Sequence, residues 1–145
     1  MGCDIHLYVE RRTDSGWEHV PDHSDDWRDD LNWYSRRNYY LFAILADVRN
    51  EGRGINPIDS PRGLPPDVTS GVDADCVEWG SDGHSHSYLT VAEVLAYDWD
   101  QITTGDMQRP YWCSINDEWW GTVARAARLS KGSLDDVRFV FWFDN

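Results

Sequence analysis

The chain has 145 residues, the usual size of one folded domain, and 41% of them are hydrophobic. Nine Trp, seven Tyr and four Phe supply large apolar side chains, so the composition excludes an intrinsically disordered chain. A formal net charge of −13 repels nucleic-acid backbones and anionic membranes, which argues against nonspecific binding to either. We therefore expect a single globular domain over residues 1–145.

The first predicted element is a strand over residues 3–11. Its side chains alternate between an apolar set, Cys3, Ile5, Leu7 and Val9, and a mixed set, Asp4, His6, Tyr8 and Glu10. A period of two is typical of a strand with one buried face. The turn residues 13–16 predict a hairpin whose second strand covers residues 17–20. The Asp-rich residues 21–38 are interpreted as an ordered loop with one helical turn.

Three helices are predicted in the middle of the chain. An apolar stripe at helical spacing indicates the first over residues 39–49. A capping box of Thr90 and Glu93 predicts the second over residues 91–97, and the third is expected over residues 117–129. Between the first two helices, residues 51–71 are rich in Gly and Pro, which is typical of a lid or a binding loop.

The last predicted element is a strand over residues 137–144. One of its faces carries Val137, Phe139, Phe141 and Phe143. This aromatic content favours a central position in a sheet. The expected fold class is therefore α+β, with a small mixed or antiparallel sheet that includes the N- and C-terminal strands and packs against about three helices.

The cysteines indicate a reducing compartment. The count of three is odd, no CxxC pair is present and no signal peptide is recognised. No apolar run approaches the ~20 residues that a membrane span needs. We therefore expect a cytoplasmic protein that is not membrane-bound. Because Cys3 lies opposite His6 on the first strand, we interpret it as a buried small side chain and not as a nucleophile.

Two segments carry residue types that bind metals. Asp4 and His6 lie two residues apart on the first strand, so their side chains project the same way. Asp82, His84 and His86 fall within five residues, and an extended backbone would place both imidazoles on one face. If the segments converge, these residues would hold a divalent transition metal, zinc or manganese. A solvent-facing pair and fortuitous loop histidines are the alternative explanations.

A candidate anion site lies in and beside the long loop. The positive charge of the chain comes from twelve Arg and one Lys, and guanidinium groups match phosphate geometry. The expected ligand-binding residues are Arg49, Asn50, Arg62, Ser85 and Ser87, with Arg53 and Asn56 nearby. The alternative explanation is a solvated basic loop surface.

The opening Met-Gly-Cys-Asp-Ile-His-Leu-Tyr-Val-Glu resembles a family of small bacteriophage and bacterial proteins that share the start Met-Gly-Cys-Asp-Ile-His. The resemblance covers most of the chain: residues 40–46, 48–50, 62–65, 82–90 and 137–145 also match. Relatives often carry Trp where this chain has Tyr88, a mild departure. The resemblance implies a setting in phage–host biology and supplies no mechanism.

Three functions remain open from the sequence. The first is a metal-dependent hydrolase acting on a small phosphorylated or nucleotide-like molecule, with Asp4, His6 and Asp144 as catalytic groups. The second is a non-catalytic binding protein that sequesters a nucleotide immune signal. The third is an acidic inhibitor of a host protein. The expected partner in the first two is a small anionic ligand, and the sequence leaves a homo-oligomer open.

Overall fold

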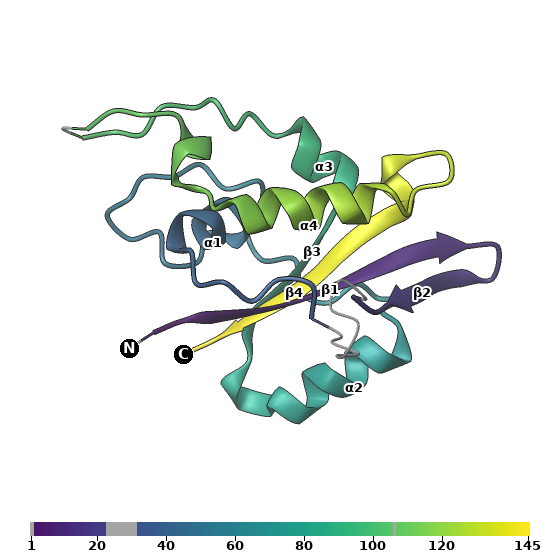
Figure 1. The fold of residues 1–145 in the computed structure, drawn as a ribbon. Helices are drawn as coiled ribbons and strands as arrows, with labels where there is room; N and C mark the ends of the chain where they lie inside the picture. The colour runs from purple at the N-terminus through teal and green to yellow at the C-terminus, as the bar shows by residue number, and fades with distance from the viewer. Residues whose placement is uncertain (1, 23–31, 106) are drawn as a thin grey trace.

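The computed structural model describes residues 2–22, 32–105 and 107–145, so part of the predicted loop 21–38 lies outside the described residues. The described strands form one antiparallel sheet in the order β2-β1-β4-β3 (Figure 1). The strands are β1 (Asp4–Thr13), β2 (Gly16–Val20), β3 (His84–Thr90) and β4 (Val137–Asp144). The α+β class is confirmed, as is the central pairing of the two terminal strands.

The three predicted helices are present with shorter bounds. They are α1 (Tyr39–Ala46), α3 (Val91–Ala96) and α4 (Asp117–Ala127). Asn38 caps the start of α1, and Asp47 ends it in a left-handed conformation, earlier than the apolar stripe predicts. The capping box of Thr90 and Glu93 is present at the start of α3, because each side chain bonds the other residue's backbone N–H.

A fourth helix, α2 (Ser70–Trp79), was not predicted from the sequence. It covers the face of the sheet opposite α1, α3 and α4 (Figure 1). Val72 is the one fully buried residue among its described positions, so the apolar periodicity that marks a helix is weak. Beneath α2, the second apolar cluster forms around Tyr8, Val140 and Trp142. Helix α2 therefore covers much of the mixed face of β1, which is not simply a solvent-exposed surface.

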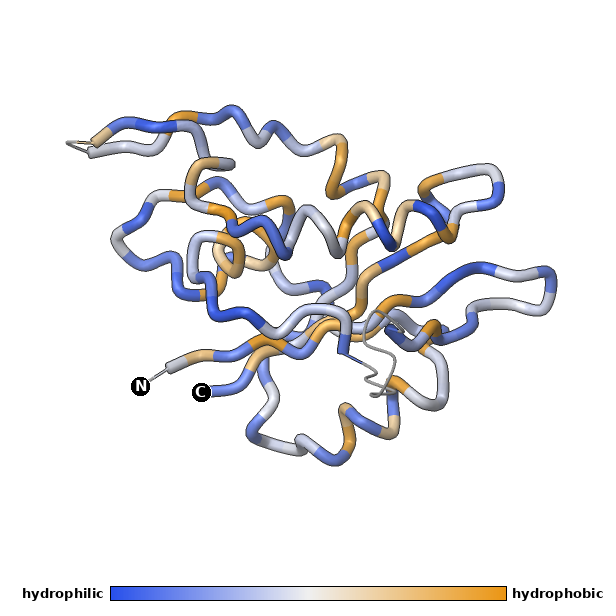
Figure 2. Tube along the Cα trace, in the orientation of Figure 1, coloured by the Kyte–Doolittle hydropathy of each residue, from blue (hydrophilic) through white to orange (hydrophobic). Residues whose placement is uncertain are grey.

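The main core lies between the sheet and the three predicted helices. The apolar set of β1 and the phenylalanines of β4 point into it, together with most of α1. Figure 2 shows hydrophobic chain where α1, α4 and the sheet meet, and hydrophilic chain in the outer loops. On the other face, the buried Glu10 pairs with the buried Arg138, which also binds Asp67 of the long loop.

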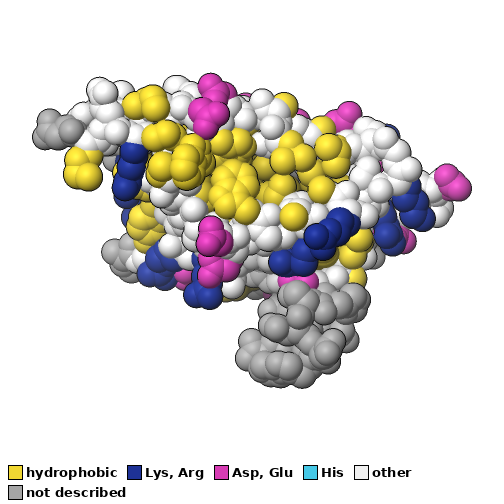
Figure 3. Space-filling model, turned by 45° about the horizontal axis from the view of Figure 1, so that its top comes forward, with side chains coloured by type: hydrophobic (Ala, Val, Ile, Leu, Met, Phe, Trp, Pro, Cys, Tyr) yellow, Lys and Arg dark blue, Asp and Glu magenta, His cyan; other side chains and the backbone are white. Residues whose placement is uncertain are grey.

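The surface carries apolar side chains over α3, α4 and the loop between them (Figure 3). The exposed large ones in this region are Leu95, Ile102, Met107 and Trp112. The 3-10 helices η1 (Gly80–Asp82), η2 (Tyr111–Ser114) and η3 (Leu134–Asp136) connect the larger elements. Within the described ranges, no helix is both long and apolar enough to cross a bilayer.

Candidate functional site

A β-bulge in β3 determines where the histidines point. His84 pairs with Phe143 and Ser87 with Phe141, so two residues of β3 stand opposite one residue of β4. The extra residue places the His84 ring beside Phe143, with centroids 6.3 Å apart, and the His86 ring beside Trp142, at 5.8 Å. Phe143 and Trp142 belong to opposite faces of β4. The expectation that the two imidazoles share one face is therefore wrong.

A pocket of about 540 Å³ lies between the end of α1, the start of the long loop and this bulge. This volume falls within the range of small-molecule sites. The lining residues are Ala46, Asp47, Val48, Arg49, Glu51, Pro61, His84, Ser85 and Asn145. Two of the predicted ligand-binding residues, Arg49 and Ser85, thus meet one predicted metal ligand, His84.

Unusual backbone conformations gather in the walls of this pocket. Among the described non-glycine residues, φ is positive at Asp47 (60°), Arg49 (57°) and Ser85 (55°), and all three line the pocket. Asp47 also serves as the left-handed end of α1, whereas Arg49 and Ser85 lie outside helices. Such a conformation costs ~1–3 kcal/mol per residue, and strained residues of this kind cluster at ligand sites.

Hydrogen bonds hold Arg49 and His84 on the same wall. The Arg49 guanidinium donates from Nη2 to the Gly2 carbonyl at 3.4 Å and to Asn145 Oδ1 at 3.3 Å. His84 Nε2 lies 3.2 Å from the same Asn145 oxygen, and its Nδ1 lies 3.0 Å from Ser85 Oγ. These partners of Arg49 are neutral oxygens, which do not cancel its positive charge.

Cys3 lies in the core behind Arg49. The residue is fully buried, as the strand pattern predicts. Burial raises the pKa of the Cys3 thiol, and the nearby Arg49 opposes this rise only in part. The thiol therefore stays protonated and acts as a small apolar side chain, because the thiolate is the reactive form of cysteine.

A second cluster forms on the α2 face of the sheet. His6 Nε2 lies 2.7 Å from Asp144 Oδ2, and both side chains are largely buried. The Trp79 ring lies 4.1 Å from the His6 ring, and Trp142 lies behind both histidines of this face. Burial lowers the pKa of His86, which favours its neutral form. The cluster offers an imidazole–carboxylate pair enclosed by indole rings.

Of the other predicted metal ligands, Asp4 lies beside this pair on β1 but is bound by Arg37, whereas Asp82 and His84 lie apart from it. Asp4 accepts two hydrogen bonds from Arg37, at 3.0 and 2.9 Å, and these bonds lower the pKa of Asp4. Asp82 is exposed in η1, and His84 faces the pocket on the other side of the sheet. In the part of the chain that the structure describes, no group of three or more His, Cys, Asp or Glu side chains is placed to hold a metal ion.

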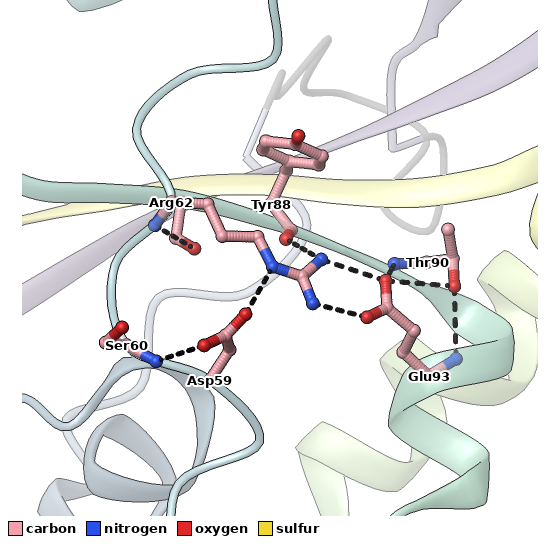
Figure 4. A network of polar contacts seen from close by, with 7 residues as sticks. Asp59, Ser60, Arg62, Tyr88, Thr90 and Glu93 are labelled. Carbon is pink, nitrogen blue, oxygen red and sulfur yellow. Dashed lines mark hydrogen bonds and ion pairs between the residues drawn. The ribbon is translucent and has the colours of Figure 1, made fainter.

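Arg62 lies in a different network (Figure 4). Its guanidinium donates to Asp59 Oδ2 at 3.0 Å, to both carboxylate oxygens of Glu93 at 3.0 and 2.5 Å, and to the Tyr88 carbonyl at 3.0 Å. Its backbone N–H donates to the buried Ser87 Oγ at 3.1 Å. Arg62 and Ser87, both predicted to bind ligand, therefore fasten the long loop to β3 and α3.

Asn50 also has a structural role. Its side chain donates to the Ile55 carbonyl at 2.7 Å and to Asp47 Oδ1 at 2.6 Å, and it accepts the Ile55 N–H at 3.0 Å. These bonds close the turn after α1. Asn145, which sequence reasoning missed, joins the site because the antiparallel pairing of β1 and β4 places the chain end beside Gly2. The predicted pairing of the two terminal strands could have indicated that Asn145 lies near Gly2.

No protein family, no curated protein and no solved structure matches this chain. Two places in the described structure combine chemically useful side chains with a defined geometry. One is the pocket beside Arg49 and His84, and the other is the His6–Asp144 pair under α2. The pocket is open to a ligand, whereas the pair is packed against indole rings.

Proposed function

We propose that this chain binds a small anionic, phosphate-bearing molecule in the pocket beside Arg49. The observation that carries this proposal is the convergence of Asp47, Arg49 and Ser85, the described non-glycine residues with positive φ, on one cavity. Strain in two separate segments persists where the surrounding structure holds it for a purpose, and ligand binding is the common one. The lining also holds the carboxylates of Asp47 and Glu51, so the anionic group of the ligand is assigned to the wall formed by Arg49 and His84.

Each polar group of the pocket has a distinct part in binding. Arg49 supplies charged N–H donors, and its bonds to Gly2 and Asn145 hold the guanidinium in place. The His84 ring and the Ser85 hydroxyl, both on β3, supply further hydrogen-bond donors. The carboxylates of Asp47 and Glu51 also line the pocket. They would repel a phosphate placed next to them and so restrict where the anionic group can bind. In the phage setting implied by the resemblance, such a site would retain a nucleotide signal.

The proposal is tested by titrating the protein with inorganic phosphate and with a nucleoside monophosphate in a calorimeter. Replacing Arg49 by Ala removes the charged donor, so affinity should fall about tenfold or more. Arg128→Ala is the matched control, because it removes one exposed arginine at the end of α4 and lies outside the pocket lining. Equal affinities in the two variants, or no binding by the unaltered protein, would contradict the proposal.

Metal-dependent hydrolysis is a second proposal, and the His6–Asp144 pair favours it. The Asp144 carboxylate lies 2.7 Å from the His6 imidazole and orients the ring, an arrangement that suits a general base. Zinc or manganese bound through Asp4 and His6 would activate a water molecule. Elemental analysis of untagged protein tests this directly. Less than about a tenth of an equivalent of metal, with no uptake of added zinc or manganese, contradicts it.

Sequestration and hydrolysis differ in the fate of the ligand. The protein is incubated with a cyclic dinucleotide or an ADP-ribose derivative, then heat-denatured, and the released molecule is analysed. Intact ligand supports binding without chemistry. Altered ligand supports hydrolysis, provided that Asp144→Asn abolishes the change, since this substitution removes the carboxylate that orients the His6 ring.

A further inference from the structure

Three arginines stack on two tyrosines beside the pocket. The Arg49 guanidinium carbon lies 5.5 Å from the Tyr39 ring centroid, and that of Arg53 lies 5.7 Å from both the Tyr39 and Tyr40 centroids. Arg109 follows at 5.9 Å from the Tyr40 centroid. We call Arg49, Arg53 and Arg109, with the two tyrosines beneath them, the arginine row. It begins at the pocket wall, because Arg49 belongs to both.

The arginine row brings together three separate parts of the chain. The tyrosines begin α1, Arg53 lies within the turn that Asn50 closes, and Arg109 belongs to the segment between α3 and η2. Tyr39 is held in place because its hydroxyl accepts the backbone N–H of Cys3 at 3.0 Å. Arg53 donates from Nη1 to the Arg49 carbonyl, which fixes the spacing of these two residues. Hydrogen bonds thus fix Tyr39 and Arg53, whereas the exposed Arg109 side chain contacts the row through the Tyr40 ring.

Two arginines of the row, Arg53 and Arg109, differ from most other described arginines in their charge environment. Seven described arginines form an ion pair with a carboxylate: Arg11, Arg12, Arg36, Arg37, Arg62, Arg125 and Arg138. Within the described ranges, no such pair is found for Arg53 or Arg109. Among the described residues, Arg53 and Arg109 therefore lie over the same tyrosine ring, that of Tyr40, without a carboxylate partner. Neighbouring positive charges repel each other, and an anionic ligand would relieve that repulsion.

We infer that the arginine row is a second anion subsite, so that the ligand of the pocket carries at least two phosphate groups. This inference rests on the proposed function of the pocket. One phosphate lies beside Arg49 and His84, and the second binds Arg53 and Arg109 along the edge of α1. The organic part of the ligand spans Tyr39 and Tyr40. The ligand class is therefore a bisphosphorylated nucleotide or a dinucleotide, and not a nucleoside monophosphate.

Two matched probes test the inference: adenosine 5′-monophosphate and adenosine 3′,5′-bisphosphate, which differ by one phosphate. Calorimetric titrations at constant ionic strength should show the bisphosphate binding about tenfold tighter or more. In Arg109→Ala, that gain should largely disappear, while the affinity for the monophosphate stays within about twofold. In Arg53→Ala/Arg109→Ala the gain should also disappear, and the two probes are compared within this variant because Arg53 also bonds the Arg49 carbonyl. Arg128→Ala should keep the full gain, because its charge lies outside the row.

The outcomes separate this inference from the proposed function. Equal affinities for the two probes overturn the second subsite and leave the pocket proposal standing. A gain that persists in the double variant also overturns it, because the second phosphate must then bind elsewhere. No binding of either probe, or of inorganic phosphate, removes both proposals together. Thermal unfolding of each variant verifies that the fold is retained, and Arg109→Ala is the safer variant since Arg53 also supports the backbone of Arg49.

Discussion

Two arginines of the same region, Arg49 and Arg62, have opposite surroundings. Arg62 donates to two carboxylates and a carbonyl, and these partners use the fork of its guanidinium (Figure 4). Arg49 donates to the neutral oxygens of Gly2 and Asn145 and faces a cavity. The ion pairs of Arg62 make it a structural fastener, whereas Arg49 lies on the wall of the pocket, where its guanidinium can contact a ligand.

The largest expected effect is on stability, and it concerns Arg62. Replacing Arg62 by Ala removes the partner of the partly buried Glu93 and detaches the long loop from α3, so the free energy of unfolding should fall by about 2 kcal/mol. Arg49→Ala should cost less, about 1 kcal/mol, since the hydrogen bonds of Arg49 to Gly2 and Asn145 are long and their acceptors are neutral oxygens. Urea denaturation measures both. Equal losses in the two variants would contradict the division of roles.

The next expected effect is the relief of backbone strain at Ser85, which tests whether the pocket walls are strained. Ser85→Gly should stabilise the fold by about 1 kcal/mol, because glycine adopts φ = 55° without the steric cost that serine bears. The same substitution should weaken phosphate binding, because it removes the hydroxyl beside His84. Ser81→Gly in η1 is the control and should be slightly destabilising. A Ser85→Gly variant that is less stable than the parent would argue against stored strain.

The acid side of the stability curve probes the Arg62 network. Hydrogen bonds from Arg62 lower the pKa of Glu93 below its ordinary value of 4.5. Because the folded-state pKa is depressed, this contribution to stability is fully present above about pH 5 and is lost as the pH falls through 4.5 and below. The stability gap between the parent and Arg62→Ala should therefore narrow between about pH 6 and pH 3. A gap that stays constant in urea titrations at pH 6, 4.5 and 3 would show that Glu93 carries little of it.

The sequence predicted those parts of the fold that repeat a local pattern. The period of two in β1 and β4 and the capping box at Thr90 are local signals, and each corresponds to an observed element. Helix α2 was missed because it buries only Val72 fully against the sheet. The bulge was missed because Ser85, and not a glycine, adopts the left-handed conformation there. Tertiary contacts impose both features, so a single sequence does not reveal them.

In the candidate site, too, the sequence indicated residue types but not the contacts that the fold imposes on them. By residue type, the sequence grouped Arg49 and Ser85 with Arg62 and Ser87 as an anion site, and it assigned His84 to a metal site. The fold places Arg49, Ser85 and His84 at one pocket and uses Arg62 and Ser87 for support. Residue type reports what a side chain can bind, whereas its partners report what it does bind. Asp59 and Glu93 lie on either side of Arg62 in the sequence, but only the packing of α3 against the loop shows that both reach it.

The smallest expected effect concerns His84 and His86, the two imidazoles at the bulge. Like Arg49 and Arg62, one of them faces the pocket and the other packs within the fold. His84 lines the pocket, whereas His86 packs against Trp142, and burial lowers the pKa of His86 below its ordinary value of 6.5. As the pH falls below about 6.5, His86 is therefore protonated more readily in the unfolded chain than in the folded one, so the free energy of unfolding should decline. His86→Gln should flatten that decline by a fraction of a kcal/mol. Ligand binding should be unchanged in this variant, because the bulge turns His86 away from the pocket; a loss of phosphate affinity equal to that of His84→Gln would mean that both imidazoles serve one site after all.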